Sequence, residues 1–321
     1  MAQTQYVQNF EPTVLRGRSA EFKGFIMPSC FKDYMEEIEN MEVRDDDIWV
    51  TSFPKSGTTW TQEMVYMIAS DLDYEGAKVT LDKRFLHLEA GILMDFKGYK
   101  EKHPDFECED YLMEPIKVIK NLKGKRLIKT HLPWELLPLQ IRNQTKKPKI
   151  IHVFRNPKDV CVSYYHHTKL LLQNKSDLED YCKKFIAGMT MFSPFWNNIY
   201  GFWNRRHFPN VLFIRYEDMK RDLPSVIRKV AEFLGKKEPN GEDMNRLVQH
   251  LGFANMKVNP AVAKNELLAK IYECLDEKRN ESQFIRAGKI GSHLEEMSKD
   301  TIDAFNKWIV ENTKGTDFKL N

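Results

Sequence analysis

The stretch Ile48–Trp60 reads IWVTSFPKSGTTW and decides the fold of this chain. Its first five residues are apolar, β-branched or small, a pattern that predicts a short buried strand. A helical pattern then runs from about Thr58 to Ser70, and the turn before it contains Pro54 and Gly57. A strand that passes through a tight turn into a helix is the opening unit of a parallel α/β sheet.

The same order of strand and helix recurs along the chain. The predicted strands are Arg126–Thr130, Lys149–Phe154 and Val211–Arg215, and the predicted helices begin at Pro157 or span Asp222–Leu234 and Lys299–Asn312. This alternation predicts the α/β class, as a single domain over residues 1–321 with helices flanking a central, mostly parallel sheet and with a P-loop-like anion-binding loop. In such sheets ligands bind beyond the carboxyl ends of the strands.

Composition excludes several functional classes. The 321 residues contain 49 Lys and Arg against 46 Asp and Glu, a formal net charge of +3. A nucleic-acid-binding protein usually has a clear basic excess, so no nucleic acid is expected as a partner. Hydrophobic residues make up 42% of the chain, enough for a large core and too many for a disordered protein.

Neither a membrane span nor a metal site is expected. The uncharged run from Phe185 to Trp203 contains Pro194, Asn197 and Asn198, so it is interpreted as a turn and a buried helix. The first residues lack the basic and apolar regions of a secretory signal. The five cysteines are widely spaced and form no CxxC pair, which predicts reduced thiols, no zinc and a cytoplasmic location.

The loop between the first strand and helix has the chemistry of an anion cradle. Gly57 permits a close approach of the backbone to a ligand. Thr58 and Thr59 stand where the unpaired N–H groups of the helix start point outward, and Lys55 adds a positive charge. A Walker A loop has its lysine after the second glycine, whereas Lys55 precedes Gly57, so an ordinary ATPase or kinase is not indicated.

This loop resembles the 5′-phosphosulfate loop of the cytosolic sulfotransferases. Those enzymes transfer a sulfuryl group from 3′-phosphoadenosine 5′-phosphosulfate (PAPS) to a hydroxyl or amine and release PAP. Further motifs that resemble the family follow in order: Lys129–Pro133 (KTHLP), Arg155–Asp159 (RNPKD), Ser163–His166 (SYYH) and Arg215–Asp218 (RYED). The resemblance extends from about Phe22 to about Gly291, so the fold and a PAPS co-substrate are expected from it.

The resemblance also implies which residues hold the cofactor. They are the phosphosulfate loop (Lys55, Ser56, Gly57, Thr58 and Thr59), the 3′-phosphate site (Arg155, Ser163, Arg286, Ala287 and Gly288) and the adenine site (Trp60, Tyr216, Leu251, Phe253 and Met256). Three features depart from the family pattern. Ala287 replaces a lysine and Leu251 replaces a threonine. The Gly-Asp-Trp of the family is also absent, with Gly291-Ser292-His293 in its place. One cation is lost, so weaker cofactor binding than in relatives with the lysine is expected.

His131 is the predicted general base. An alcohol or phenol attacks sulfur poorly until its proton can leave, and a neutral imidazole is a suitable acceptor near pH 7. Lys55 is expected to stabilise the bridging oxygen of the leaving phosphate, with Lys129 and His131 at the sulfonate oxygens. In the family, the serine that corresponds to Ser163 also contacts the loop lysine. These cations neutralise the developing charge, so no metal is required.

The acceptor is expected to be a small hydrophobic alcohol or phenol, including steroids and retinoids, in a dry pocket. Candidate lining residues are Phe22, Phe25, Phe31, Phe85, Leu88, Met189, Met191, Phe192, Phe195 and Trp196. The segment from Phe85 to Lys129 is long, resembles the lid region of insect relatives that include a retinol dehydratase, and is predicted to cover this pocket.

Two alternative functions stay open. One is a retinol-dehydratase-like enzyme that sulfates its substrate transiently and then eliminates the sulfate. The other, suggested by Ala287 and Leu251, is a nucleotide-binding pseudoenzyme, and it is disfavoured by the presence of Lys55, Lys129 and His131. The sequence leaves the oligomeric state as a monomer or a homodimer.

Overall fold

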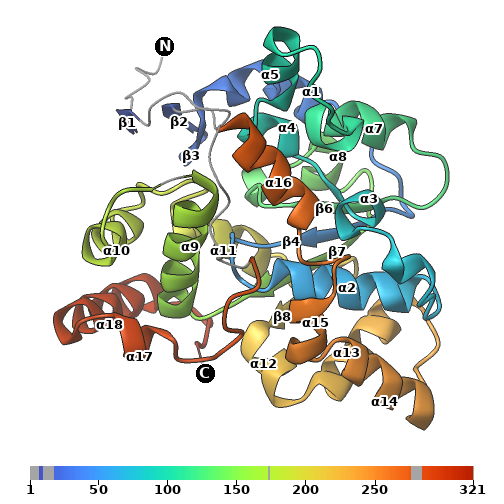
Figure 1. Ribbon diagram of the computed structural model, residues 1–321. Coiled ribbons are helices and arrows are strands. Elements are labelled where there is room, and N and C mark those ends of the chain that lie inside the picture. Colours follow the sequence, from blue (N-terminus) through green and yellow to red (C-terminus); the bar gives the residue numbers. More distant parts are fainter. Residues whose placement is uncertain (1–6, 10–17, 173, 276–283, 321) are drawn as a thin grey trace.

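A five-stranded parallel sheet forms the centre of the computed structural model, which describes residues 7–9, 18–172, 174–275 and 284–320 (Figure 1). The strand order is β5 (Leu86–His87), β6 (Leu127–Thr130), β4 (Ile48–Thr51), β7 (Lys149–Phe154) and β8 (Val211–Arg215). Thr51 pairs with Thr130 on one side and with His152 on the other. The carboxyl ends of the three central strands are therefore nearly level, and the residues that follow them meet at one edge.

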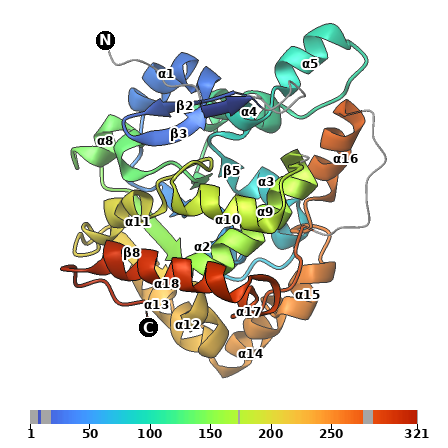
Figure 2. The same ribbon diagram turned by 90° about the vertical axis from the view of Figure 1, so that its left-hand side faces the viewer.

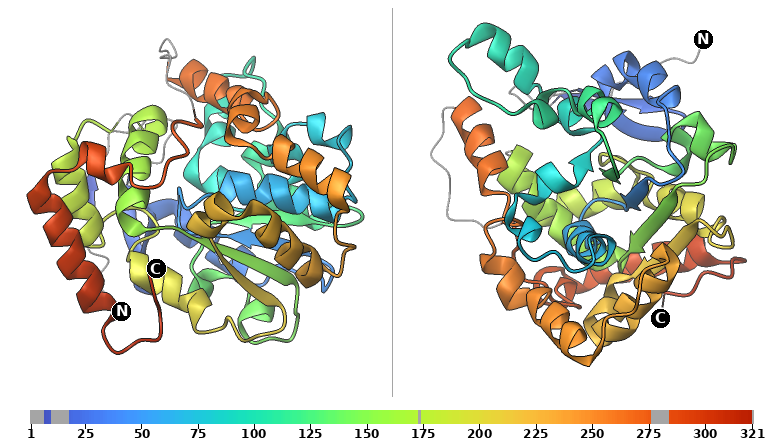
Figure 3. Two further views of the ribbon diagram at one scale, coloured as in Figure 1. Left: turned by 90° about the horizontal axis from the view of Figure 1, so that it is seen from below. Right: turned by 90° about the vertical axis from the view of Figure 1, so that its right-hand side faces the viewer.

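Helices cover both faces of this sheet. One face carries α2 (Thr58–Ala69), α12 (Tyr216–Arg221), α13 (Leu223–Leu234) and α14 (Gly241–His250); the other carries α9 (Pro157–Leu172), α10 (Leu178–Ile186), α11 (Phe195–Trp203) and α18 (Lys299–Thr313) (Figures 2 and 3). Side chains of a strand alternate between faces, so Ile48 and Val50 belong to the first core and Trp49 to the second. Burial on both faces explains why the strands are so apolar.

A small antiparallel sheet lies beside the main one. It consists of β1 (Val7–Asn9), β2 (Arg18–Phe22) and β3 (Phe25–Pro28). The N–H of Ile26 donates to the carbonyl of Ser193 at 2.8 Å, and the N–H of Phe192 donates back to Ile26 at 2.7 Å. These bonds attach the N-terminal strands to the loop before α11, next to the carboxyl edge of the main sheet.

The remaining elements lie mostly at the periphery, and most of them are short. They are η1 (Ser29–Asp33), α1 (Met35–Glu39), η2 (Gly76–Lys78), α3 (Leu81–Arg84), α4 (Ala90–Leu93), α5 (Phe96–Lys102), α6 (Asp110–Met113), α7 (Pro115–Asn121), η3 (Trp134–Leu136), α8 (Leu139–Arg142), α15 (Phe253–Val258), α16 (Asn265–Cys274) and α17 (His293–Glu296). Helices α3 to α7 belong to the long segment between Phe85 and Lys129 or directly precede it.

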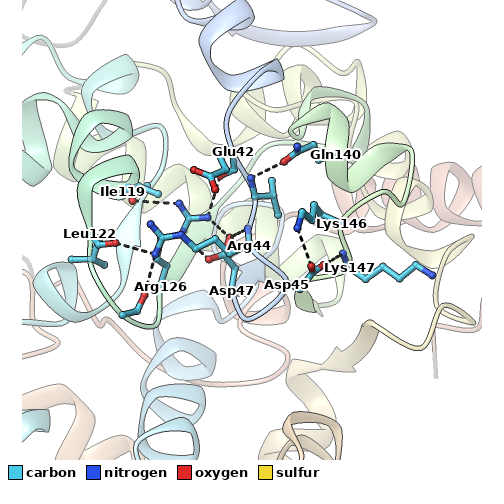
Figure 4. Close-up of polar contacts among 12 residues, drawn as sticks. Glu42, Arg44, Asp45, Asp47, Ile119, Leu122, Arg126, Gln140, Lys146 and Lys147 are labelled. Atoms are coloured by element: carbon cyan, nitrogen blue, oxygen red, sulfur yellow. Dashed lines mark hydrogen bonds and ion pairs between the residues drawn. The ribbon is translucent and has the colours of Figure 1, made fainter.

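A buried ion pair fixes the amino edge of the sheet, opposite the expected site (Figure 4). Nε and Nη2 of Arg126 each donate to a carboxylate oxygen of Asp47 at 2.6 Å, and Nη2 also donates to the carbonyl of Glu42. Asp47 directly precedes β4 and Arg126 directly precedes β6. The planar guanidinium matches the carboxylate in a two-point geometry, which holds the two strands in register.

The predicted strands and helices are confirmed, with ends that differ by one or two residues. The run from Phe185 to Trp203 forms the end of α10, a turn and the buried helix α11, as expected. No helix in the described part of the chain is both long and apolar enough to cross a bilayer. Prediction missed the N-terminal strands and β5, which contains only two residues.

Candidate active site

A cavity of about 1340 Å³ opens at the carboxyl edge of the parallel sheet. Its lining includes these predicted site residues: Lys55, Gly57, Thr58, Thr59, Trp60, Lys129, His131, Arg155, Ser163, Tyr216, Leu251, Phe253, Met256, Arg286, Ala287 and Gly288. Ser56 is the predicted site residue that does not line the cavity. It is fully buried, and its hydroxyl oxygen has no hydrogen-bond partner in the described structure. The fold thus brings together segments that are more than 200 residues apart.

The phosphate loop has the backbone of an anion site. Lys55 and Gly57 both have positive φ angles, 69° and 105°, and α2 begins directly after them. A Cβ at position 57 would lie 2.6 Å from the Tyr216 ring, so close packing excludes any side chain there. Gly57 is also the N-cap and offers no capping side chain, which leaves the first N–H groups of α2 available to a ligand.

A second cationic pocket surrounds Arg155, which follows β7. Its guanidinium lies 4.4 Å from the centre of the Tyr216 ring and donates to the carbonyls of Lys55 and Lys289. The side chain is largely buried, and its Nε has no hydrogen-bond partner in the described structure. Arg155 therefore joins the phosphate loop to the C-terminal segment. Nη1 and Nη2 each donate one of these bonds and each carry a second hydrogen for an anion.

The C-terminal segment from Phe284 to Lys289 closes this pocket. Gly288 has a φ of 58°, and a Cβ there would lie 2.2 Å from the ring of Phe253. Arg286 donates to Glu296 at 2.9 Å. Trp60 and Tyr216 meet edge to face at 5.5 Å between ring centres, which gives the cavity an apolar wall beside its cations.

His131 is held in one tautomer. Its Nδ1 lies 2.9 Å from the carbonyl oxygen of Ser52, which can only accept, so Nδ1 carries the hydrogen and Nε2 keeps a free lone pair. The backbone N–H of His131 donates to the Glu89 carboxylate, which also accepts from Thr130. The imidazole thus has the orientation and protonation that a base needs.

The electrostatics of the cavity favour a multivalent anion. Burial, together with the positive charges of Lys129 and Arg155, lowers the pKa of Lys55 to about 7. Burial and the charge of Lys264 lower the pKa of Lys129 to about 8. Burial lowers the pKa of His131 well below its ordinary value, and the nearby Lys129 adds to this effect. Positive charges crowd together here, and an anion would relieve their repulsion.

Sequence reasoning missed four polar residues of this region: Asp82, His87, Glu89 and Lys264. Asp82, His87 and Lys264 line the cavity, and the fully buried Glu89 lies directly behind it, where it binds His131. The ring of His87 meets that of His131 at 5.6 Å. Leu86, Leu88 and Ala90 alternate with His87 and Glu89, and this pair of polar side chains in a mostly apolar stretch was a signal that could have identified Glu89.

The apolar part of the cavity differs from the prediction. Of the ten candidates, Met191 and Phe192 line it, whereas Met189 is exposed and the others belong to the hydrophobic cores. The apolar lining comes instead mainly from the segment after Phe85 and from α16: Ala90, Leu93, Met94, Phe96, Tyr111, Leu112 and Leu267. The long segment therefore does border the pocket.

The charged lining is strongly one-sided. Its cations are Lys55, Lys129, Arg155, Lys169, Lys175, Lys184, Lys220, Lys264, Arg286 and Lys289, and among the described lining residues Asp82 alone is acidic. Within the described residues, no cluster of three or more His, Cys, Asp or Glu side chains could hold a metal ion.

Comparisons with known proteins agree with this geometry. The profile of the family described as "Sulfotransferase domain" matches residues 45–317. The luciferin sulfotransferase of Photinus pyralis is 43% identical over 290 residues, which are 90% of this chain and 77% of that protein. The amine sulfotransferase of Oryctolagus cuniculus is 32% identical over 288 residues, 89% of this chain and 86% of that protein.

Solved structures give the same result. A retinol dehydratase crystallised with androsterone and the inactive cofactor PAP matches with a TM-score of 0.83 and 31% identity. The match covers 99% of this chain and 92% of that one. A second structure of retinol dehydratase contains retinol and PAP. The chain therefore belongs to the sulfotransferase family, and the PAPS-dependent sulfotransferase activity predicted from its motifs is confirmed at that level.

Proposed function

We propose that this chain transfers the sulfuryl group of PAPS to a hydroxyl of a small hydrophobic acceptor, within a single domain formed by residues 1–321. One observation carries the proposal: a loop cradle around Lys55 and a cationic pocket around Arg155 open into the same cavity as the free Nε2 of His131. A nucleotide with a phosphosulfate and a 3′-phosphate needs two such anion sites.

The residues present fit PAPS. Lys55 and the N–H groups of Gly57, Thr58 and Thr59 would hold the phosphosulfate, with Ser56 contributing its backbone. The residues that would bind the 3′-phosphate are Arg155, Ser163, Arg286, Ala287 and Gly288. The residues that would surround adenine are Trp60, Tyr216, Leu251, Phe253 and Met256. When bound, PAPS supplies an activated sulfuryl group whose leaving group is a phosphate.

The transfer step would use three side chains with different roles: His131, Lys55 and Lys129. The Nε2 of His131 accepts the proton of the acceptor hydroxyl as its oxygen attacks sulfur. Lys55 donates to the bridging oxygen, which gains negative charge as its bond to sulfur breaks, and Lys129 binds the sulfonate oxygens. Ser163 lies on α9 at the same cavity, where its hydroxyl can bind the 3′-phosphate and Lys55.

The acceptor class follows from the cavity wall and from the relatives. The wall formed by Met94, Phe96, Tyr111 and Phe192 suits a phenol, steroid, retinoid or other alcohol. Retinol and androsterone occupy related structures, and a luciferin sulfotransferase is among the relatives. The dehydratase-like alternative shares the first step and differs in its product.

A cytoplasmic location, a role in small-molecule metabolism such as detoxification, and a monomeric or homodimeric state complete the proposal.

Product analysis tests this function. Purified protein is incubated with PAPS and a panel of phenols, steroids, catecholamines and retinoids, and the products are identified by mass spectrometry. A sulfate ester together with PAP supports transfer, whereas PAP with a dehydrated product supports the dehydratase alternative. If no acceptor yields PAP while PAPS still binds, the pseudoenzyme alternative is the correct one.

Ala287→Lys is expected to tighten PAP binding by roughly tenfold, because it returns a cation to the pocket around Arg155, and one charge-assisted bond to phosphate has about this effect. Isothermal titration of both proteins with PAP measures the change. Val79→Lys adds the same charge and is the matched control, and Lys32→Met removes one charge; both residues are exposed and outside the cavity. Equal affinity of Ala287→Lys and the native protein would show that the missing lysine does not limit binding.

A further inference from the structure

An ion pair that the transfer mechanism does not use lies inside the cavity. Lys264 directly precedes α16, and Asp82 belongs to α3, 182 residues earlier. Their side chains form a direct ion pair, and each is less than 10% exposed. Both line the cavity.

The ammonium group of Lys264 lies near Lys55 and Lys129, the two lysines assigned to the transfer step. Its ammonium nitrogen lies 5.8 Å from the centre of the Phe284 ring, and that of Lys55 lies 4.4 Å from the same centre. The positive charge of Lys264 contributes to the lowered pKa of both Lys55 and Lys129. Lys55 and Lys264 therefore lie near the same ring of the cavity lining, and Lys129 lies close enough to Lys264 for their charges to repel.

A structural role alone explains this pair poorly. Burying two charges costs desolvation energy that their attraction often fails to repay, and an apolar pair would hold the two segments at least as well. The segments are already joined, because the N–H of Leu81 donates to the carbonyl of Ala261 at 2.8 Å. Lys264 also has a φ of 54°, in the left-handed region that residues with side chains rarely adopt. A charged residue in such a place is often functional.

We propose that Lys264 is a further catalytic residue whose ammonium binds the sulfonate oxygens of the transferring group, and that Asp82 positions it. This inference rests on the proposed function. In the transfer step, the acceptor oxygen forms a bond to sulfur and its proton goes to Nε2 of His131. The bond between sulfur and the bridging oxygen breaks, and its electron pair stays on PAP. Lys264 transfers nothing. It binds the sulfonate oxygens in the PAPS complex and binds them more strongly in the transition state, where it holds the sulfuryl group in line with the attacking oxygen.

Comparing PAPS with PAP tests the assignment, because PAP lacks the sulfuryl group. Lys264→Met is expected to lower kcat by roughly tenfold to a hundredfold and to weaken PAPS binding, measured without acceptor, by about tenfold. The affinity for PAP is expected to change by less than about twofold, since the other cations hold the phosphates. Asp82→Asn keeps the ammonium of Lys264 but removes the carboxylate that positions it. The decreases in kcat and in PAPS affinity are therefore expected to be smaller than those of Lys264→Met.

Two further variants make the result decisive. Lys264→Arg keeps a cation and is expected to restore most of the PAPS preference. Lys83→Met removes an exposed lysine of α3 outside the cavity and is the matched control. If Lys264→Met weakens PAP and PAPS equally, or leaves both unchanged, the assignment is wrong. Unfolded protein binds neither PAPS nor PAP, so a loss of stability lowers both apparent affinities alike. It does not change the ratio of the PAPS affinity to the PAP affinity, which is the expected result.

The role of Lys264 and the proposed sulfotransferase function can be contradicted separately. Absence of any sulfated or dehydrated product from the native enzyme would contradict the function. A native enzyme that is active with PAPS, but whose Lys264→Met variant has unchanged kcat, would contradict the role of Lys264 alone.

Discussion

His131→Ala is expected to lower kcat by a factor of at least about 100, the lower end of the contribution of a general base. The hydrogen bond from Nδ1 to the carbonyl of Ser52 leaves Nε2 unprotonated and accessible to the cavity. Alanine removes this acceptor, so the hydroxyl must attack with its proton in place. Steady-state kinetics at saturating PAPS measure the loss, and calorimetry with PAP shows that the cofactor site is intact.

The pH profile gives an independent test of the same residue. The pKa of His131 is well below its ordinary value in the free protein because of burial and of the nearby Lys129. The imidazole then stays neutral to a lower pH than an ordinary histidine, so kcat is not expected to fall as the pH drops through the range in which a free histidine becomes protonated. His207→Ala is the control, since His207 is exposed and lies outside the cavity. A kcat for His131→Ala within about threefold of the native value would exclude the role of general base.

The fold was predictable because its signals are local. Strands such as Lys149–Phe154 are continuous apolar runs, as expected for strands buried on both faces. The helix Leu223–Leu234 begins after its N-cap Asp222 and ends at Gly235, which has a φ of 65°. Strand β5 was missed because two residues carry no recognisable period.

The gathering of the candidate site residues at one cavity could be predicted where a sequence motif contains them, but not where only tertiary contacts bring them together. The loop from Lys55 to Thr59 and the pair Lys129 and His131 stand at strand ends, where ligands of parallel sheets bind. The pair formed by Asp82 and Lys264 depends on two segments that meet only in the folded chain. No local pattern distinguishes this lysine from an ordinary surface residue.

The apolar wall illustrates a further limit. Phe31 and Phe85 are fully buried in the cores, whereas Phe192 faces the cavity. Residues of a hydrophobic core and residues of an apolar pocket have the same residue types and the same spacing in the sequence, because both kinds of site exclude water. Only the three-dimensional arrangement separates them, and it places residues such as Leu93 and Met94 in the lining of the cavity.

Lys55→Met is expected to lower kcat by roughly a factor of 100 to 1000, the usual cost of removing one donor from a developing negative charge. The bridging oxygen gains charge as its bond to sulfur breaks, and Lys55 stands at the loop that would hold it. Methionine keeps the length and most of the packing against the Phe284 ring, so the change removes mainly the charge. Lys32→Met is the control, and a loss below about tenfold would show that Lys55 does not act in the transfer step.

The same residue links cofactor binding to pH. In the free protein the pKa of Lys55 is about 7, so above pH 7 the side chain is mostly neutral. A bound phosphate favours the charged form and raises this pKa, so PAP binding takes up a proton, and its affinity falls by up to about tenfold per pH unit between pH 7.5 and 8.5. Lys129, with a pKa of about 8, adds to the effect at higher pH. Titration at pH 8 in two buffers of different ionisation enthalpy measures the uptake, and Lys55→Met is expected to reduce it. Equal heats in both buffers would mean that PAP binding takes up no proton at pH 8, which would contradict the expected change in the charge of Lys55 on binding.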